Sequence, residues 1–386
     1  MISFLDRNEQ AGGRSSGFDY LRIILALAVM GAHSVATSYG EEVDYEVWKT
    51  PLRPFLCLLL PMFFALSGYL VALSFYRSKT LLKFLSLRII RIYPALVAET
   101  VLSAFVLGPL FTTLTLHDYF TDPLFKQYML NMFGDVHFFL PGLFDGNPYY
   151  PLVNAQLWTV PYELLCYISL ACLATIGALR YRVLGLISPI LLASAYCFTR
   201  LYRHGGELPG HNTAVPGPFL VISFLCGVAI CLYREKLPHN LGVFLVCAGI
   251  SIFIYSDSVA TGSFADYIAP FTVAYCTIYL GLTNVPRIRL INSADYSYGI
   301  FLYHFSIQQA IMHSVPWARQ WYLNLAICLP ITVVFAVASW HSVERPFLSL
   351  RRGIDALEDR YLELWARGKR TALTLSYSKT RPHAPD

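Results

Sequence analysis

Long apolar stretches recur at nearly regular spacing along this chain, and many reach about 20 residues, the length that an α-helix needs to cross a bilayer. Hydrophobic residues make up 56% of the sequence and charged residues only 14%, whereas soluble domains carry about 25% charged residues. Because backbone polar groups inside a bilayer must find partners within the chain, each stretch is expected to be helical. The sequence therefore predicts an all-α, polytopic membrane protein. About ten transmembrane helices are expected, at roughly 18–38, 52–76, 92–112, 156–178, 182–200, 216–233, 240–256, 265–283, 294–313 and 322–344.

Lysine and arginine are spread unevenly between these stretches. They gather after every second stretch and in the C-terminal tail, whereas loop 113–155 holds four aspartates against Lys126. Because cytoplasmic loops carry an excess of Lys and Arg, both termini are expected in the cytoplasm and loop 113–155 outside. Arg200 and Arg203 in the fifth turn are the exception. The net charge of +5 thus indicates topology, and no nucleic-acid partner is expected.

This topology divides the chain into three parts. Residues 1–17 are polar, lack the apolar region of a secretory signal and are expected to form a cytoplasmic N-terminal segment. Residues 18–348 form the predicted membrane domain, and 349–386 a cytoplasmic tail with charges at helical spacing. Loop 113–155 is either a connector or, as loops of that length often are, a functional element such as a lid or acceptor platform. The nine cysteines lie inside apolar runs without paired spacing, so no metal site is expected.

The first apolar stretch carries two ionisable residues whose spacing places them on one helix face. Arg22 opens it, and His33 lies eleven residues further on with no charged residue between them. Eleven helical residues return to nearly the same face about 16 Å along the axis. An ionisable side chain within a membrane helix indicates a functional site, although a histidine hydrogen-bonded inside a helix bundle is the alternative.

Depth along the expected spans groups the other polar residues into two layers. His33, Glu163, Tyr303 and His304 fall near the middle of the bilayer, on three different spans. The arginines of the second layer lie nearer the cytoplasm and come from separate parts of the chain: Arg22, Arg88, Arg91 and Arg345.

Each layer suits a particular chemistry. Arginine forks bind phosphates bidentately and stay charged, so the inner layer suits a phosphorylated cytoplasmic ligand. A histidine near a carboxylate suits general-base catalysis, with Glu163 orienting or balancing the imidazole of His33. The alternatives are arginines that only set topology and a buried structural pair. Ser67 and Gly68 are interpreted as a site of close helix packing.

Several short motifs together resemble the acyltransferase 3 family of integral-membrane O-acyltransferases. The resemblance covers about residues 18–348, although Ile23, Leu87 and Thr159 differ from the residues usual in the family. The motifs are Asp19-x-x-Arg22-x10-His33, Phe63-Phe64-Ala65-Leu66-Ser67-Gly68, Arg88-Ile89-Ile90-Arg91-Ile92-Tyr93-Pro94, Leu157-Trp158-Thr159-x-x-x-Glu163, Ser297-Tyr298-Gly299-Ile300-Phe301-Leu302-Tyr303-His304 and Glu344-Arg345-Pro346.

The resemblance implies transfer of an acyl group, most often acetyl, from cytoplasmic acyl-CoA to a hydroxyl of a cell-surface or exopolysaccharide glycan. The acceptor would be the glycan or a lipid-linked saccharide, in the inner membrane of a bacterium. His33 and Glu163 are the expected catalytic residues, with His33 either a base or an acyl carrier. The four inner arginines would hold the CoA phosphates. Trp158, Tyr303 and His304 would contact the acceptor or the oxyanion.

Two points stay open at this level. The acyl group could also be succinyl, and the acceptor sugar is not defined by the motifs. A polytopic transporter of a glycan or small anionic metabolite is the competing function, because intramembrane charges are typical of transporters too. The clustering of arginines favours an anchored phosphate ligand and hence the enzyme.

Overall fold

The computed structural model describes residues 2–13, 15–177, 179–208, 211, 214–256, 264–288 and 294–364. All regular elements of this part of the chain are helices, which confirms the predicted all-α class. The longer ones are α2 (Gly17–Tyr39), α4 (Arg53–Arg77), α5 (Leu81–Leu102), α9 (Val160–Thr175), α10 (Arg182–Arg203), α11 (Gly217–Leu232), α12 (Leu241–Ser256), α13 (Ala269–Gly281), α15 (Ser297–Ser314) and α16 (Trp321–Ser339). The shorter ones are α1 (Phe4–Gln10), α3 (Glu41–Val47), α6 (Gly108–Phe111), α7 (Leu116–Thr121), α8 (Pro123–Tyr128) and α17 (Arg345–Ser349).

The structure tests which helices are long and apolar enough to cross a membrane. Among the described residues, six helical runs are long and apolar enough, so the predicted count of about ten is not confirmed. They are Gly17–Tyr39, Arg53–Arg77, Leu81–Phe111, Ala155–Thr175, Arg182–Arg203 and Trp321–Leu364. The apolar helices α11 and α12 have 16 residues each, which gives a length of about 24 Å. α11 is buried along almost its whole length, so its hydrophobicity reflects packing inside the bundle.

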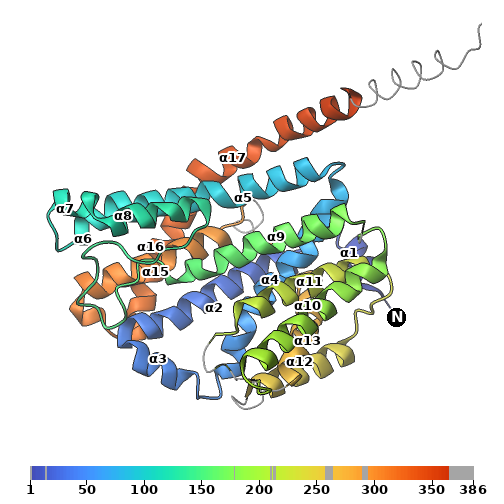
Figure 1. Ribbon diagram of the computed structural model, residues 1–386, viewed down its shortest axis with the longest axis horizontal. Coiled ribbons are helices and arrows are strands. Elements are labelled where there is room, and N and C mark those ends of the chain that lie inside the picture. Colours follow the sequence, from blue (N-terminus) through green and yellow to red (C-terminus); the bar gives the residue numbers. More distant parts are fainter. Residues whose placement is uncertain are drawn as a thin grey trace, which may run out of the picture.

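The helices pack around α2 and α4. In Figure 1, α10 to α13 lie on one side of this pair, α15 and α16 lie at its left end, and α5 runs above it with the C-terminal helix. The motif residues Arg22 and His33 lie on α2, and Ser67 and Gly68 lie on α4. The centre of the bundle therefore carries two of the sequence motifs.

The backbones of α4 and α11 touch at two glycines. A Cβ atom on Gly68 would overlap the carbonyl oxygen of Phe224, and one on Gly227 would overlap that of Ala65. This reciprocal contact confirms that Gly68 permits close helix packing, as small residues do in membrane proteins.

A methyl group at Gly68 is expected to force these two helices apart. Overpacking of a tight contact costs about 1–3 kcal/mol, so Gly68→Ala should lower the thermal midpoint of the detergent-solubilised protein. Gly249→Ala is the matched control, because it lies within α12 with open space around its Cβ position. Equal midpoints for the two variants would contradict this account of the α4–α11 contact.

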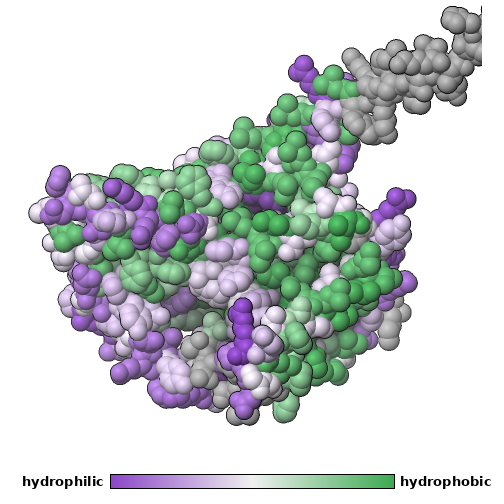
Figure 2. Space-filling view, in the orientation of Figure 1, coloured by the Kyte–Doolittle hydropathy of each residue, from purple (hydrophilic) through white to green (hydrophobic). Residues whose placement is uncertain are grey.

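The surface is consistent with a lipid environment. Figure 2 shows hydrophobic residues over much of α5 and the right-hand helices, whereas hydrophilic residues gather over α7, α8 and α3. On α10, the side chains of Val183, Leu186, Leu191 and Phe198 are exposed. Together with the six long apolar helices, this indicates a membrane protein.

Loop 113–155 is ordered and has its own small core. Tyr119, Tyr128, Leu143 and Phe144 are buried against one another beside the end of the α5 run. At the end of this loop, the Asn154 amide donates hydrogen bonds to Glu99 and to the hydroxyl of Tyr128. The loop is thus fixed to the bundle rather than a plain connector.

The last helix continues past the predicted domain boundary. The helical run from Trp321 extends to Leu364, with a π-helical turn at Trp340–Glu344 and a turn residue at Leu350 within it. Lys83 holds its far part through Asp355 (2.9 Å) and Glu358 (2.8 Å). Residues 365–386 of the predicted tail lie outside the described residues.

Candidate functional site

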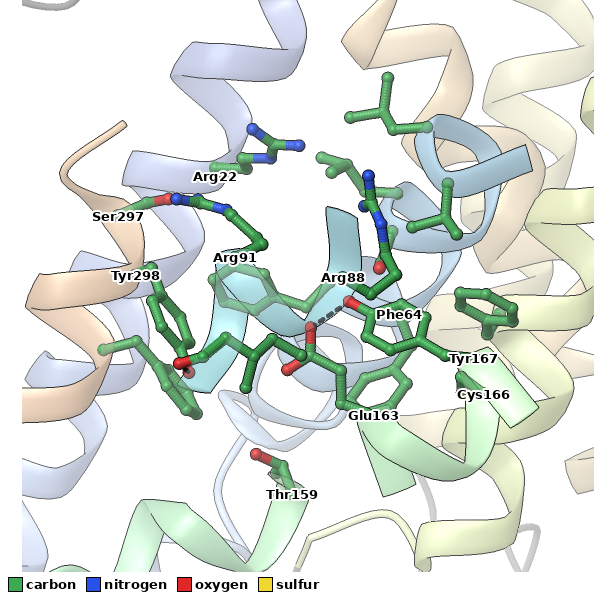
Figure 3. Close-up of a pocket in the computed structure, with 18 of the residues that line it drawn as sticks. Arg22, Phe64, Arg88, Arg91, Thr159, Glu163, Cys166, Tyr167, Ser297 and Tyr298 are labelled. Carbon is green, nitrogen blue, oxygen red and sulfur yellow. Dashed lines mark hydrogen bonds between the residues drawn. The ribbon is translucent and has the colours of Figure 1, made fainter. Parts of the chain in front are cut away.

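Arg22, Arg91 and two carboxylates form an ion-pair network at one end of α2. Arg22 Nη1 lies 2.8 Å from Asp295 Oδ2, and Arg91 Nη2 lies 2.5 Å from the same oxygen. Arg91 Nη1 also reaches Glu344 Oε2 at 3.2 Å. The π-helical turn brings Glu344 to this point, and such turns are frequent at functional sites. Figure 3 shows the two guanidiniums close together.

Arg88 differs from the other two arginines. Its Nη2 donates to the Ser74 hydroxyl at 3.1 Å, and its guanidinium lies about 6.0 Å from the ring centre of Tyr167. Among the described residues, no carboxylate lies within ion-pair distance of Arg88. Of the three arginines, Arg88 is therefore the one whose charge a bound anion would neutralise most directly.

The three arginines line two adjoining cavities. The first has a volume of about 350 Å³ and lies beside the N-terminal segment; Arg77 and Arg351 add further guanidiniums to its wall. Arg345 is exposed and lines none of the cavities described here, so the structure does not bring it to the predicted site. In the sequence, Arg77 and Arg351 indicate only the cytoplasmic side of the membrane, because no motif distinguishes them from the other arginines expected there.

The second cavity has a volume of about 160 Å³ and adjoins the first. Glu163 lines it with Arg22, Arg88 and Arg91, and its carboxylate accepts a hydrogen bond from Tyr167 at 2.6 Å. Figure 3 shows Glu163 and Tyr167 joined in this way below the arginines. The expected contact between Glu163 and His33 is not present. Glu163 lines a cavity with the arginines, and the imidazole of His33 has another hydrogen-bond partner.

That partner is His304. Nδ1 of His33 lies 2.8 Å from Nε2 of His304, and the two rings are stacked with centroids 5.1 Å apart. Nδ1 of His304 lies 3.0 Å from the carbonyl oxygen of Ile300. A carbonyl can only accept, so in the neutral pair His304 carries its hydrogen on Nδ1 and accepts on Nε2. His33 must then carry its hydrogen on Nδ1, which leaves the lone pair of its Nε2 free.

The third cavity, the outer chamber, has a volume of about 1060 Å³ and is the largest of the three. His33, Gln156 and Trp158 line it together with α3. Trp158 therefore lines the same cavity as His33. Tyr303 is buried and donates to Ser339 at 3.0 Å, and His304 is fully buried behind His33. Neither of these two lines the chamber, so the structure does not support direct acceptor contact for them.

The three cavities share walls and so lie in series across the bundle. Arg22, Arg88 and Arg91 line both the first and the second. Leu60, Thr159 and Phe301 line both the second and the outer chamber. Guanidiniums line one end of this series of cavities and the imidazole of His33 lines the other. The series therefore matches a long ligand with an anionic group at one end and a reactive group at the other.

Comparison with known proteins identifies the family of the chain. The profile of the acyltransferase 3 family, described as an acyltransferase domain, matches residues 15–341. The chain therefore belongs to this family of acyltransferases. It is 26% identical over 370 residues to "Nodulation protein 10" of Rhizobium leguminosarum bv. viciae, covering 90% of this chain and 97% of the relative. It is 24% identical over 352 residues to the "O-acetyl transferase" of Shigella phage Sf6, covering 87% and 97%. No solved structure matches the chain.

These matches and the helical architecture define the class of protein. It is a membrane enzyme that transfers acyl groups, of the O-acetyltransferase kind.

Proposed function

We propose that this enzyme moves an acyl group, most often acetyl, from cytoplasmic acyl-CoA to a hydroxyl of a cell-surface or exopolysaccharide glycan. The observation that carries the proposal is the series of three cavities with arginines at one end and His33 at the other. The enzyme would lie in the bacterial inner membrane with both termini in the cytoplasm, which the distribution of Lys and Arg supports.

The donor would enter at the first cavity. Its phosphates would meet Arg88 first, because Arg22 and Arg91 already share Asp295. The pantetheine arm would lie in the narrow second cavity, where Glu163 and Thr159 offer oxygen atoms to its amide groups. The thioester would then reach the boundary with the outer chamber, beside His33.

The reaction would occur at Nε2 of His33. This nitrogen would take the proton of the acceptor hydroxyl as the oxygen attacks the thioester carbon. The C–S bond then breaks, and the CoA thiolate leaves and recovers the proton from the imidazolium. Direct acylation of His33, followed by transfer to the acceptor, is the other route, and both use the same free lone pair.

His304 would fix the tautomer of His33 in either route. A glutamine in place of His304 can still accept from Nδ1–H of His33 through its Oε1, whereas a leucine cannot. His304→Gln should therefore retain much more activity than His304→Leu, with the pH–rate profile of the Leu variant altered. Similar losses in two variants of equal thermal stability would show that His304 acts only through packing. The measurement is the initial rate of acyl transfer across a pH series, on protein purified in detergent.

The proposed function is tested by mass spectrometry of surface glycans. A deletion strain is expected to lose one acyl modification, and complementation with the wild-type gene should restore it. An unchanged set of acylated glycans under conditions in which the wild-type protein is produced would contradict the proposal. The mass that disappears also distinguishes acetyl from succinyl.

A further inference from the structure

The mouth of the outer chamber carries a group of fixed carboxylates. Glu41, Glu42 and Asp44 of α3 line it. Glu41 accepts a hydrogen bond from the hydroxyl of Tyr150 at 2.5 Å. The indole of Trp48 donates to Asp44 at 3.4 Å, and burial raises the pKa of that carboxyl. Asp44 is thus partly buried against the chamber wall, whereas Glu41 is oriented by Tyr150 but stays exposed.

Carboxylates outnumber basic side chains in the described lining of the chamber. Neither lysine nor arginine occurs among the described residues that line the chamber. Lys49 is not part of the lining, although it pairs with Glu46 at 2.6 Å and lies 4.3 Å from the ring centre of Tyr45, which lines the chamber. The chamber therefore presents negative potential to whatever enters it.

The rest of the wall suits a sugar. Trp48, Trp158 and Trp321 line the chamber, and aromatic faces attract the polarised C–H bonds of a pyranose ring. Gln156 also lines it and is 1% exposed. Its Nε2 donates to the carbonyl of Leu302 at 2.5 Å, but its Oε1 accepts from no described residue. Buried polar atoms are normally paired, so an oxygen without a described partner in this wall favours a ligand that donates a hydrogen bond there.

We propose that the outer chamber binds the acceptor saccharide and selects sugars without negative charge, whether neutral or amine-bearing. Uronic acids and other anionic sugars would be rejected, because like charges facing each other across an interface are strongly disfavoured. This inference rests on the proposed function, which supplies the role of acceptor. It adds the charge class of the sugar that can lie beside His33.

Binding of three matched probes tests the proposal: maltotriose, a glucosamine trimer and trigalacturonate. Three of the six tryptophans line the chamber, so intrinsic fluorescence of the nanodisc-embedded protein can follow each titration. The glucosamine trimer is expected to bind most tightly, maltotriose next, and trigalacturonate at least about tenfold more weakly than maltotriose. The differences between the probes should shrink as salt is added.

Neutral isosteres identify the groups responsible. The triple variant Glu41→Gln, Glu42→Gln, Asp44→Asn should bind trigalacturonate about tenfold more tightly than the wild type and leave maltotriose binding unchanged. Asp145→Asn is the control for loss of an outer carboxylate, because Asp145 is exposed in loop 113–155 and does not line the chamber. Thermal midpoints show whether each variant remains folded.

Three outcomes would overturn the inference: equal binding of the neutral and anionic trimers to the wild type, an unchanged ratio in the folded triple variant, or binding of none of the probes. CoA binding is measured on the same samples. Charge-selective saccharide binding without CoA binding would overturn the proposed donor and leave this inference standing.

Discussion

Replacing His33 by glutamine is expected to abolish most acyl transfer, with a loss of about 10² to 10⁴ in rate, as is typical when a general base is removed. The side-chain amide of the introduced glutamine could still donate a hydrogen bond to Nε2 of His304, so the local packing and the His304 tautomer should persist. The amide cannot take a proton or carry an acyl group. His33→Gln should therefore fold and bind CoA normally but leave the glycan unmodified.

The control is His33→Ala, which removes both the chemistry and the contact with His304. Similar activity losses in the Ala and Gln variants, with normal CoA binding in both, would assign the effect to proton or acyl transfer. A His33→Gln enzyme that acylates at a near-normal rate would make His33 a structural residue. Incubation of the wild type with acyl-CoA alone, followed by mass analysis of the protein, separates the acyl-carrier route from the base route.

Replacing Arg88 by lysine is expected to weaken CoA binding by about tenfold or more. Lysine keeps the charge but loses the planar fork that matches a phosphate, and a hydrogen bond to a charged group is worth about 1.5–3 kcal/mol. Because Arg88 forms no ion pair with the described carboxylates, this variant should keep the stability of the wild type. Equilibrium binding of CoA to the purified protein is the measurement.

Arg345→Gln is the matched control, because Arg345 is exposed and lines none of the three cavities. It should leave CoA binding unchanged. Arg91→Ala is less informative: it leaves Glu344, which is 2% exposed, without its cation and Asp295 with Arg22 alone, and breaking a buried pair destabilises by about 3–5 kcal/mol. If Arg88→Lys and Arg345→Gln affect CoA binding equally, Arg88 is not the phosphate ligand.

The helical class and the membrane setting could be predicted from hydrophobicity alone, but the number of spans could not. Hydropathy does not distinguish lipid from protein as the apolar surroundings of a helix. α11 is as apolar as a membrane span, yet it has 16 residues and is enclosed by its neighbours. The role of Gly68 was predictable from the small pair Ser67-Gly68 within an apolar stretch, because small residues let membrane helices approach closely.

The candidate site was predicted in part. Spacing along one helix placed Arg22 and His33 correctly relative to each other, and the inner arginines Arg88 and Arg91 do join Arg22. Depth alone suggested that Glu163 supports His33, but helices at one depth can face different cavities. Asp295 and Glu344 were missed as partners of Arg91, because their meeting depends on a loop and on a π-helical turn that no sequence pattern indicated.

Donor and acceptor are expected to bind from opposite faces of the membrane. Acyl transfer across a sealed bilayer tests this expectation. Proteoliposomes of one orientation would receive labelled acetyl-CoA on the side of the N-terminus only. Deacylated glycan from the deletion strain would be supplied on the other side only. The account predicts that label appears on the glycan and free CoA thiol on the donor side, with neither product in the His33→Gln protein. Labelling that occurs only when the acetyl-CoA and the glycan share one side would contradict the account.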